Sequence, residues 1–348
     1  MKQTIITRSV RLATADQQII VPQATADSAG AFLMGALEAW DPTLYKPLVN
    51  YTYTRDLDLR LDASMGTEVS SWSRETFGAD AGTSSGSRKA IISKKADALP
   101  GVSADLDKQF NPLYPWGMTA KWSVFEMAAA ALMQQAGVPV SPDLSQMDAI
   151  NLKWNMDNDE MAYIGDTALN KFGLLNTPGV SVTNVPNGAS GFADWARKTP
   201  QEILNDLNAA IVANWTNTGY ALMSNRIGLP PVAYAYISQA LVSTAGSQSI
   251  LSYLRLNNIA STQAGATLEI VPMKFAASAG VGGVGRMVVY SKDRNIIRFP
   301  QVAPMRTPLQ LNGIQQSVDV YAKLGVVEVV RPEAISYWDG VTAAGAGG

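Results

Sequence analysis

The chain of 348 residues contains neither cysteine nor histidine. Their absence excludes disulfides, thiol nucleophiles, zinc sites built on these side chains, and acid–base catalysis by imidazole. Catalysis would have to use carboxylates, lysine, tyrosine or serine–lysine pairs, so a cytosolic enzyme of that kind stays open as an alternative. The two absences count against it. We expect a protein that is not an enzyme, with no catalytic residue, no cofactor and no metal.

Charge is also scarce in this chain. Charged residues make up 16% of the sequence against 47% hydrophobic residues, and the net charge is −2. This balance is typical of a folded protein with two or three compact regions, and it argues against a disordered scaffold or a basic protein that coats nucleic acid. No apolar run approaches the ~20 residues that span a bilayer, and the N-terminus lacks a signal-peptide core. We therefore expect no membrane partner.

Residues 56–62 alternate strictly between apolar and charged side chains. This period of two predicts a strand with one apolar and one charged face. The charged face could suggest a cation site, but a calcium-binding EF-hand loop would need glycine and glutamate at set positions that this segment lacks. We therefore expect a solvated face. The alternating residues are Leu57, Leu59 and Leu61, with Asp56, Asp58, Arg60 and Asp62 between them.

The segment that follows resembles two extended arms around a loop of small residues, 79–87. Isolated two-stranded hairpins are marginally stable in water, so we expect this one to bury its surface on another chain. Its basic residues are interpreted as a solvated loop, with nonspecific contact to a polyanion as the alternative. The residues expected to contact a neighbouring subunit are Arg74, Phe77, Arg88, Lys89, Lys94 and Lys95.

The segment RIGLPPVAYAYIS predicts a strand, a turn and a helix, and four further segments are predicted to be helical. They cover residues 28–40, 119–137, 143–164 and 199–215. The third is a rod of roughly 30 Å that Gly165 ends, and the fourth opens with a capping box formed by Thr199 and Glu202. Apolar residues at helical spacing are more often core than a cofactor site. The predicted core residues of the third helix are Leu144, Met147, Ile150, Trp154, Met161 and Ile164.

A glycine-rich segment, GVGGVG, matches the spacing of a dinucleotide-binding loop. Its glycines are Gly280, Gly282, Gly283 and Gly285. The following residues, MVVYSKDRNIIRF, predict strands, whereas a dinucleotide-binding loop must open a helix. We therefore interpret GVGGVG as a loop between strands. The remaining tail alternates well enough for long strands before a frayed end, and the fold class is mixed α+β.

The order of these parts resembles the major capsid proteins of tailed bacteriophages. Their shell fold is named after phage Hong Kong ninety-seven and is shared with encapsulins. The resemblance extends over roughly residues 50 to 340. The segments that carry it are DNDEMAYIG with KFGLLN, TPQEILNDL, RIGLPPVAYAYIS, LEIVP and VVEVVRPEAI.

This resemblance implies a division of the chain into arm, loop and domains. It implies an N-terminal arm (1–54), an extended loop (55–118), a peripheral domain (119–184) with a spine helix (143–164), an axial domain (185–302) with the glycine loop, return strands of the peripheral domain (303–341), and a flexible tail (342–348). No lysine and asparagine could be matched to the self-crosslinking pair of some relatives.

The function implied by the resemblance is that of a major capsid protein. Such a subunit assembles as pentamers and hexamers into an icosahedral shell around double-stranded DNA, in a virion built in the host cytoplasm. The implied partners are further copies of the chain, DNA held by nonspecific contacts, and portal, scaffold and decoration proteins. The alternatives are an encapsulin-type shell with a cargo protein and, in a different class, the carboxylate- or serine–lysine-dependent enzyme.

Overall fold

The computed structural model describes residues 9–14, 17–22, 47–79, 90, 99–135, 141–243, 246, 248–265 and 267–343. The chain forms two compact units, one of residues 1–48 and 125–142 and the other of residues 49–124 and 143–348. The first contains an antiparallel hairpin, β1 (Ser9–Thr14) with β2 (Gln17–Pro22), and most of helix α3 (Val124–Gln135). The predicted helix at 28–40 lies outside the described residues. Everything below concerns the second unit.

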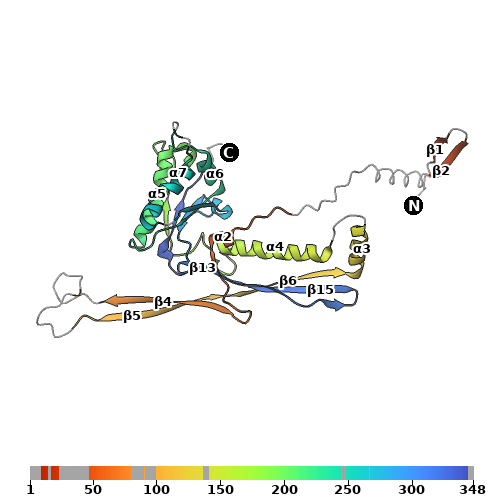
Figure 1. The fold of residues 1–348 in the computed structure, drawn as a ribbon, viewed down its shortest axis with the longest axis horizontal. Coiled ribbons are helices and arrows are strands. Elements are labelled where there is room, and N and C mark those ends of the chain that lie inside the picture. Colours follow the sequence, from red (N-terminus) through yellow and green to blue (C-terminus); the bar gives the residue numbers. More distant parts are fainter. Residues whose placement is uncertain are drawn as a thin grey trace, which may run out of the picture. The chain divides into compact units, whose positions relative to one another are not determined.

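Helix α4 (Pro142–Tyr163) is the longest helix of the described residues and confirms the predicted helix within one residue at each end (Figure 1). Its 22 residues correspond to about 33 Å. Gly165 follows with a φ of 78°, in the left-handed region that glycine adopts without strain. The predicted stop at this glycine is confirmed.

The chain returns along the end of α4 in the sequence FGLLN. The main-chain N–H groups of Leu174 and Leu175 and the side-chain amide of Asn176 donate to three carbonyls of the last turn, at 2.7–3.0 Å. These carbonyls have no partner within a helix, so the return segment satisfies them. The approach is close: a Cβ at Gly173 would lie 2.4 Å from the carbonyl carbon of Tyr163.

A six-stranded sheet supports α4. Its central strand, β15 (Gln315–Leu324), pairs antiparallel with β6 (Tyr114–Ser123) over ten residues and also with β13 (Ile297–Arg306). The remaining strands are β14 (Gln310–Asn312), β16 (Glu328–Val329) and β3 (Asp58–Arg60). The prediction that a helix begins at residue 119 is therefore wrong: residues 119–123 complete β6, and the helix begins at Val124.

Helix α4 contacts this sheet at two places. Trp116 of β6 packs edge-on against Trp154, with ring centroids 5.0 Å apart, and its indole N–H donates to Asp157 at 2.8 Å. Near the other end, the side-chain amide of Gln146 accepts from the N–H of Lys121 and donates to its carbonyl, both at 2.8 Å. The edge of β6 thus meets a glutamine amide in place of a further strand.

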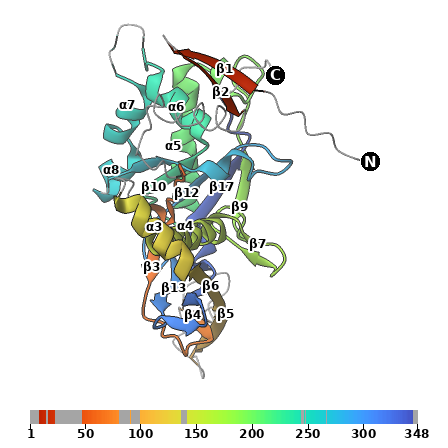
Figure 2. The same cartoon turned by 90° about the vertical axis from the view of Figure 1, so that its right-hand side faces the viewer.

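A five-stranded sheet forms the other layer of the unit. Its order is β11 (Glu269–Pro272), β10 (Arg226–Leu229), β12 (Arg286–Tyr290), β17 (Ile335–Asp339) and β9 (Ser181–Asn184). One face is covered by α5 (Pro200–Asn217), α6 (Pro231–Gln239) and α7 (Ile250–Leu256), with α8 (Ile259–Ala264) packed on α5 (Figure 1, Figure 2). The segment 303–341 therefore divides between two sheets, because β15 and β17 belong to different ones.

The alternation along β12 builds two cores from one strand. Met287 and Val289 lie in the core under the helices, whereas Val288 and Tyr290 lie in the core with Tyr163 at the end of α4. Because successive side chains of a strand point to opposite faces, a sheet buried on both sides needs apolar residues throughout. This explains the continuous apolar run MVVY, which the sequence correctly predicts as a strand after the glycine loop.

Helix α5 begins as its sequence predicts. The Thr199 hydroxyl accepts from the N–H of Glu202, and the Glu202 carboxylate accepts from the N–H of Thr199, which completes the capping box. The N–H groups of Ala189 and Thr199 hold the pKa of Glu202 below its ordinary value.

At the end of the chain, the carbonyl of Thr342 accepts from the N–H of Trp195 at 2.9 Å. The first residue of the predicted tail is thus bound, and residues 344–348 lie outside the described part.

Residues 53–62 differ from the prediction of one strand with a solvated charged face. Residues 53–56 form a short helix, α2 (Tyr53–Asp56), and the strand β3 covers only Asp58–Arg60. The Asp56 carboxylate is fully buried. The prediction is wrong here because partners distant in sequence, which local alternation cannot reveal, pair with this charge.

Candidate functional site

The acidic side chains of the described residues do not converge on a reaction site. One cavity of about 390 Å³ is lined by Asp157, Glu160 and Asp166. Asp157, however, is paired with Lys153 and with the Trp116 indole. No group of three or more acidic residues in the described ranges could hold a metal ion, and no helix there is long and apolar enough to cross a membrane. The elements that extend away from the two sheets are more informative.

The most extended element is a hairpin of β4 (Val69–Ala79) and β5 (Val102–Pro112), seen in Figure 1. The strands pair antiparallel without a register shift, from Val69 opposite Pro112 to Ala79 opposite Val102. Eleven residues of strand correspond to about 37 Å. The connection at its far end, residues 80–89 and 91–98, lies outside the described residues.

The two faces of this hairpin differ in character. Because residues opposite each other share a face, the register gathers most of the large apolar side chains on one side. Phe77 is 80% exposed there, Leu106 71% and Phe110 61%. We call this the apolar face; it consists of Val69, Ser71, Ser73, Glu75, Phe77, Ala79, Val102, Ala104, Leu106, Lys108, Phe110 and Pro112.

The opposite, polar face turns toward the sheets at the base of the hairpin. Ser70, Trp72 and Arg74 follow one another on this face, and each contacts a residue of β13 or of the β16–η3 segment. Arg74 lies 3.3 Å from Glu333, in η3 (Pro332–Ala334). A cavity of about 410 Å³ lies beside these contacts. The polar face is thus partly covered by the same subunit, while Phe77, Leu106 and Phe110 of the apolar face stay exposed.

A buried carboxylate lies at the base of the hairpin. Glu328 of β16 is fully buried, accepts from the Ser70 hydroxyl, and pairs with Arg298 at 2.6 Å and Arg60 at 3.5 Å. These three partners come from β4, β13 and β3. A buried charge is tolerated when it is paired and hydrogen-bonded, so Glu328 joins the hairpin base to the six-stranded sheet.

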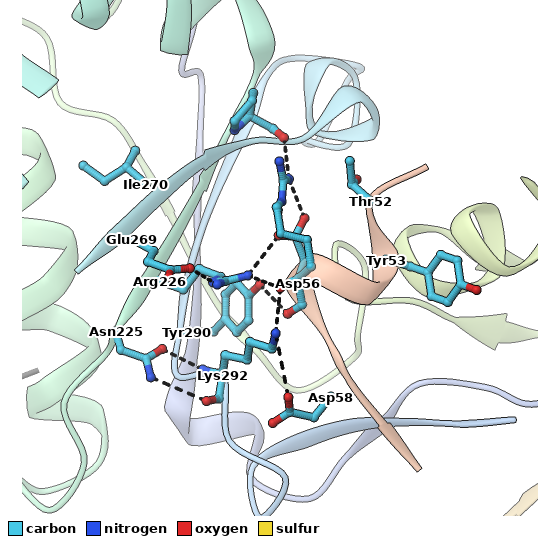
Figure 3. A network of polar contacts seen from close by, with 12 residues as sticks. Thr52, Tyr53, Asp56, Asp58, Asn225, Arg226, Glu269, Ile270, Tyr290 and Lys292 are labelled. Carbon is cyan, nitrogen blue, oxygen red and sulfur yellow. Dashed lines mark hydrogen bonds and ion pairs between the residues drawn. The ribbon is translucent and has the colours of Figure 1, made fainter. Parts of the chain in front are cut away.

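A second buried carboxylate, Asp56, lies at the end of α2 (Figure 3). Arg55 and Arg226 pair with it at 2.7 and 3.0 Å, and the Tyr163 hydroxyl donates to its other oxygen. The Tyr290 hydroxyl donates to the Asp56 carbonyl at 2.8 Å. The cluster joins α2 to the five-stranded sheet and to the end of α4.

The beginning of α2 is held by the same helix α4. Asp159, also fully buried, accepts from the N–H groups of Thr52 and Tyr53 at 2.7 and 3.1 Å. A carboxylate at a helix N-terminus satisfies free N–H groups there. Lys274 approaches the other Asp159 oxygen at 2.7 Å. The segment that follows residue 49 is therefore fixed at both ends of its short helix.

A fourth buried carboxylate, Asp339 of β17, supports the glycine loop. It pairs with Arg286 through two bonds of 2.6 and 2.8 Å and accepts from the N–H of Val281 at 3.0 Å. Burial acts to raise the pKa of Asp339, but the Arg286 guanidinium and the Val281 N–H hold it below its ordinary value. Arg286 also donates to the Leu175 carbonyl at 2.6 Å. One arginine thus joins the return segment of α4 to the glycine loop.

A family model described as major capsid protein matches residues 88–341, which is most of the chain. The chain belongs to the major capsid protein family. No curated protein matches the sequence of this capsid protein.

Solved structures are similar to this capsid protein over nearly their whole length. The capsid of Myoviridae Phage XM1 has a TM-score of 0.71 and 17% identity, covering 88% of this chain and 98% of that chain. The holo-SrpI encapsulin complex from Synechococcus elongatus has a TM-score of 0.52 and 12% identity, covering 92% and 97%. A chain of Mycobacterium phage Ogopogo has 0.51 and 12%, covering 87% and 96%. These similarities confirm the predicted α+β shell fold of phage capsids, which encapsulins share.

The residues predicted for contact with a neighbouring subunit lie in different places. Phe77 lies on the apolar face of the hairpin, whereas Arg74 lies on the polar face and pairs within its own subunit. The four basic residues of the predicted loop lie outside the described residues: Arg88, Lys89, Lys94 and Lys95. Their role stays a prediction.

The predicted core of α4 is confirmed mainly toward its C-terminal end. Ile150, Trp154 and Met161 are buried, and Met147 and Ile164 are half-buried. Leu144 is 63% exposed, so the prediction that it belongs to the core is wrong for the subunit. The physical reason is that the first turn of α4 extends past the buried contacts, which begin near Ile150.

The predicted loop glycines Gly280, Gly282, Gly283 and Gly285 precede β12, with positive φ at Gly282 and Gly283.

Sequence reasoning missed several residues of this capsid protein. The strand β5 carries Val102, Leu106 and Phe110 four residues apart, all on one face of a strand, a signal that could have predicted its apolar face. The buried carboxylates Asp56, Glu328 and Asp339 gave no such signal. Most of their partners come from distant segments of the chain.

Proposed function

We propose that this chain is the major capsid subunit of a tailed bacteriophage, assembling as pentamers and hexamers into an icosahedral shell that encloses double-stranded DNA. The observation that carries the proposal, beyond family membership, is the exposed apolar face of the β4–β5 hairpin. Phe77, Leu106 and Phe110 are exposed on a ribbon that has only two strands. Such a ribbon is marginal in water unless something covers it.

A second copy of the chain is the partner that suits this surface. Exposed apolar patches of this extent mark interaction sites. In this proposal the surface that receives the hairpin on the neighbour differs from the hairpin itself. Contacts between unlike surfaces are heterologous and close into rings when the rotation between copies fits. Rings of five and six such subunits are the units of an icosahedral shell.

The parts of the fold suit the roles that the resemblance implies. In this proposal α4 is the spine helix of the peripheral domain, together with the six-stranded sheet, and β4 and β5 form the extended loop. The five-stranded sheet and α5 to α8 form the axial domain, which β17 joins from the end of the chain. Residues 1–54 are the arm.

The subunit is proposed to act as part of the virion, built in the host cytoplasm, and as a structural protein without catalysis. DNA held by nonspecific contacts, a portal, a scaffold and decoration proteins are its further proposed partners. The net charge of −2 suits a wall around DNA, because a strongly basic wall would bind the genome tightly. An encapsulin-type shell is the second candidate, supported by the TM-score of 0.52 to an encapsulin. The content of purified particles, DNA or a cargo protein, separates the two.

Negative-stain electron microscopy of the purified protein tests the proposal. We expect rings, sheets or closed shells from the unmodified chain, and loss of these assemblies in Phe77→Lys. The control is Thr76→Lys, which places the same charge one residue away on the polar face. Both positions are exposed, so both variants should keep the thermal stability of the subunit. A protein that stays monomeric in every salt and concentration, or equal assembly by both variants, would contradict the proposal.

A further inference from the structure

The contacts at the base of the hairpin decrease in burial along the polar face. Ser70 donates to the fully buried Glu328, Trp72 packs near the Arg298 guanidinium with 5.9 Å to the ring centroid, and Arg74 pairs with Glu333 at the surface. These residues lie at successive positions of one face of β4. We call the two sheets together with α4 the body of the subunit. The hairpin is therefore bound to the body most strongly through the first residues of β4.

Glu328 is the residue on which these contacts converge. Its carboxylate accepts from β4 through Ser70, from β3 through Arg60 and from β13 through Arg298. Arg60 also donates to the Ser70 hydroxyl at 2.9 Å and to the Ser71 carbonyl at 3.2 Å. If the hairpin turned away, Glu328 would lose the Ser70 donor, and the Arg60 bonds that join β3 to β4 would break. Loss of a partner by a buried charged group is costly.

The base of the hairpin is closed on the other side by a second contact. The Lys323 ammonium group, on β15, donates to the Thr67 carbonyl at 2.7 Å, just before β4 begins. The N–H of Leu113, just after β5, donates to the Glu68 carbonyl at 2.8 Å. The Lys323 bond therefore joins the start of the hairpin to the six-stranded sheet, and the Leu113 bond joins the two strands to each other where β5 continues into β6.

A small change in the angle of the hairpin at its base produces a large displacement at its far end. A turn of about 10° at the base moves the end of a ribbon of about 37 Å by about 6 Å, which exceeds the ~4.8 Å spacing between neighbouring strands. The apolar face of the hairpin would then miss the surface that it must cover on another copy. The direction of the hairpin thus sets the angle between neighbouring subunits.

We propose that Glu328 is a positioning residue, which fixes the direction of the β4–β5 hairpin in the free subunit and so determines the curvature and size of the shell. This inference rests on the proposed function, because it assumes that the hairpin covers a neighbouring copy. It adds a residue that is buried within its own subunit yet controls how neighbouring copies meet.

The variant Glu328→Gln tests this role, with Glu333→Gln as a matched control. Both changes remove one carboxylate charge next to the hairpin, but Glu333 pairs at the surface and Glu328 is buried. Hydrogen exchange on the subunit should show amides of residues 69–72 and 109–111 exchanging roughly ten to one hundred times faster in Glu328→Gln. Electron microscopy should show open sheets or shells of widely varied diameter. Glu333→Gln should match the unmodified protein in both measurements.

Two further results keep the test decisive. If Glu328→Gln does not fold, Ser70→Ala removes one donor from β4 and leaves both arginines in place, and the same exchange and diameter changes are expected, in weaker form. Shells of unaltered diameter together with unaltered exchange, in a folded variant, would overturn the inference. If the unmodified chain forms no shells at all, the proposed function fails instead, and the exchange rates still decide whether Glu328 holds the hairpin.

Discussion

Tyr163, the last residue of α4, donates its hydroxyl hydrogen to the carboxylate of Asp56, 107 residues earlier in the chain. Burial and the nearby Asp56 charge raise the pKa of Tyr163 far above its ordinary value, so the hydroxyl stays protonated and can donate. The contact closes a cluster in which Arg55 and Arg226 neutralise a fully buried charge. One carboxylate therefore links three parts of the subunit: the end of α4, the five-stranded sheet and the short helix α2.

Removing the Asp56 charge should destabilise the subunit more than removing the Tyr163 hydroxyl. We expect Asp56→Asn to lower the free energy of unfolding by about 3–5 kcal/mol, because the buried Arg226 loses its only buried carboxylate partner and keeps the exposed Glu269. Tyr163→Phe should cost about 2 kcal/mol, the value of one hydrogen bond to a charged group. Denaturant unfolding of the unassembled subunit measures both. Equal and small decreases in the free energy of unfolding for both variants would contradict this, because they would mean that water replaces the lost contacts.

A methyl group at Gly173 should destabilise the return of the chain along α4. A Cβ there would lie 2.4 Å from the Tyr163 carbonyl carbon, so the backbone of one segment must move. We expect Gly173→Ala to cost about 3 kcal/mol or more. Gly179→Ala is the control: its φ is +81° but nothing lies within 4 Å of its Cβ, so only the backbone strain of about 1–2 kcal/mol applies. Equal melting temperatures of the two variants would contradict the close approach.

Acid should weaken the contact between the glycine loop and β17. The pKa of Asp339 is lower in the folded chain than its ordinary value, so the stability that its charge contributes is present above about pH 4 and is lost as the pH falls through the folded pKa. We expect Asp339→Asn to lose less melting temperature than the unmodified chain between about pH 5 and about pH 3. The exposed Asp105→Asn is the control. An unchanged pH dependence in Asp339→Asn would count against this assignment.

Segments with a strong local signal were predictable from the sequence. The bounds of α4, its stop at Gly165 and the capping box of Thr199 depend on neighbours a few residues away. The apolar run of β12 after the glycine loop is equally local. These elements could be predicted because spacing and end residues decide them.

The errors have a common physical cause. Thr119 belongs to β6 because it pairs with Asp319, 200 residues further on, although the residues that follow it favour a helix. Asp56 alternates with leucines as a solvated strand residue would, yet Arg226 pairs with it from 170 residues away. Contacts across such distances override local preference. The buried carboxylates Asp56 and Glu328 could be found only once the strands were placed.

The Gln146 amide on the edge of β6 has a consequence for a protein that must reach high local concentration. A bare strand edge can pair with the edge of any other sheet and start aggregation. At Lys121 both main-chain groups are already bonded to the glutamine. A foreign strand would have to displace this amide before it could add to β6. The helix that stiffens the subunit thus also protects it from wrong partners while copies gather.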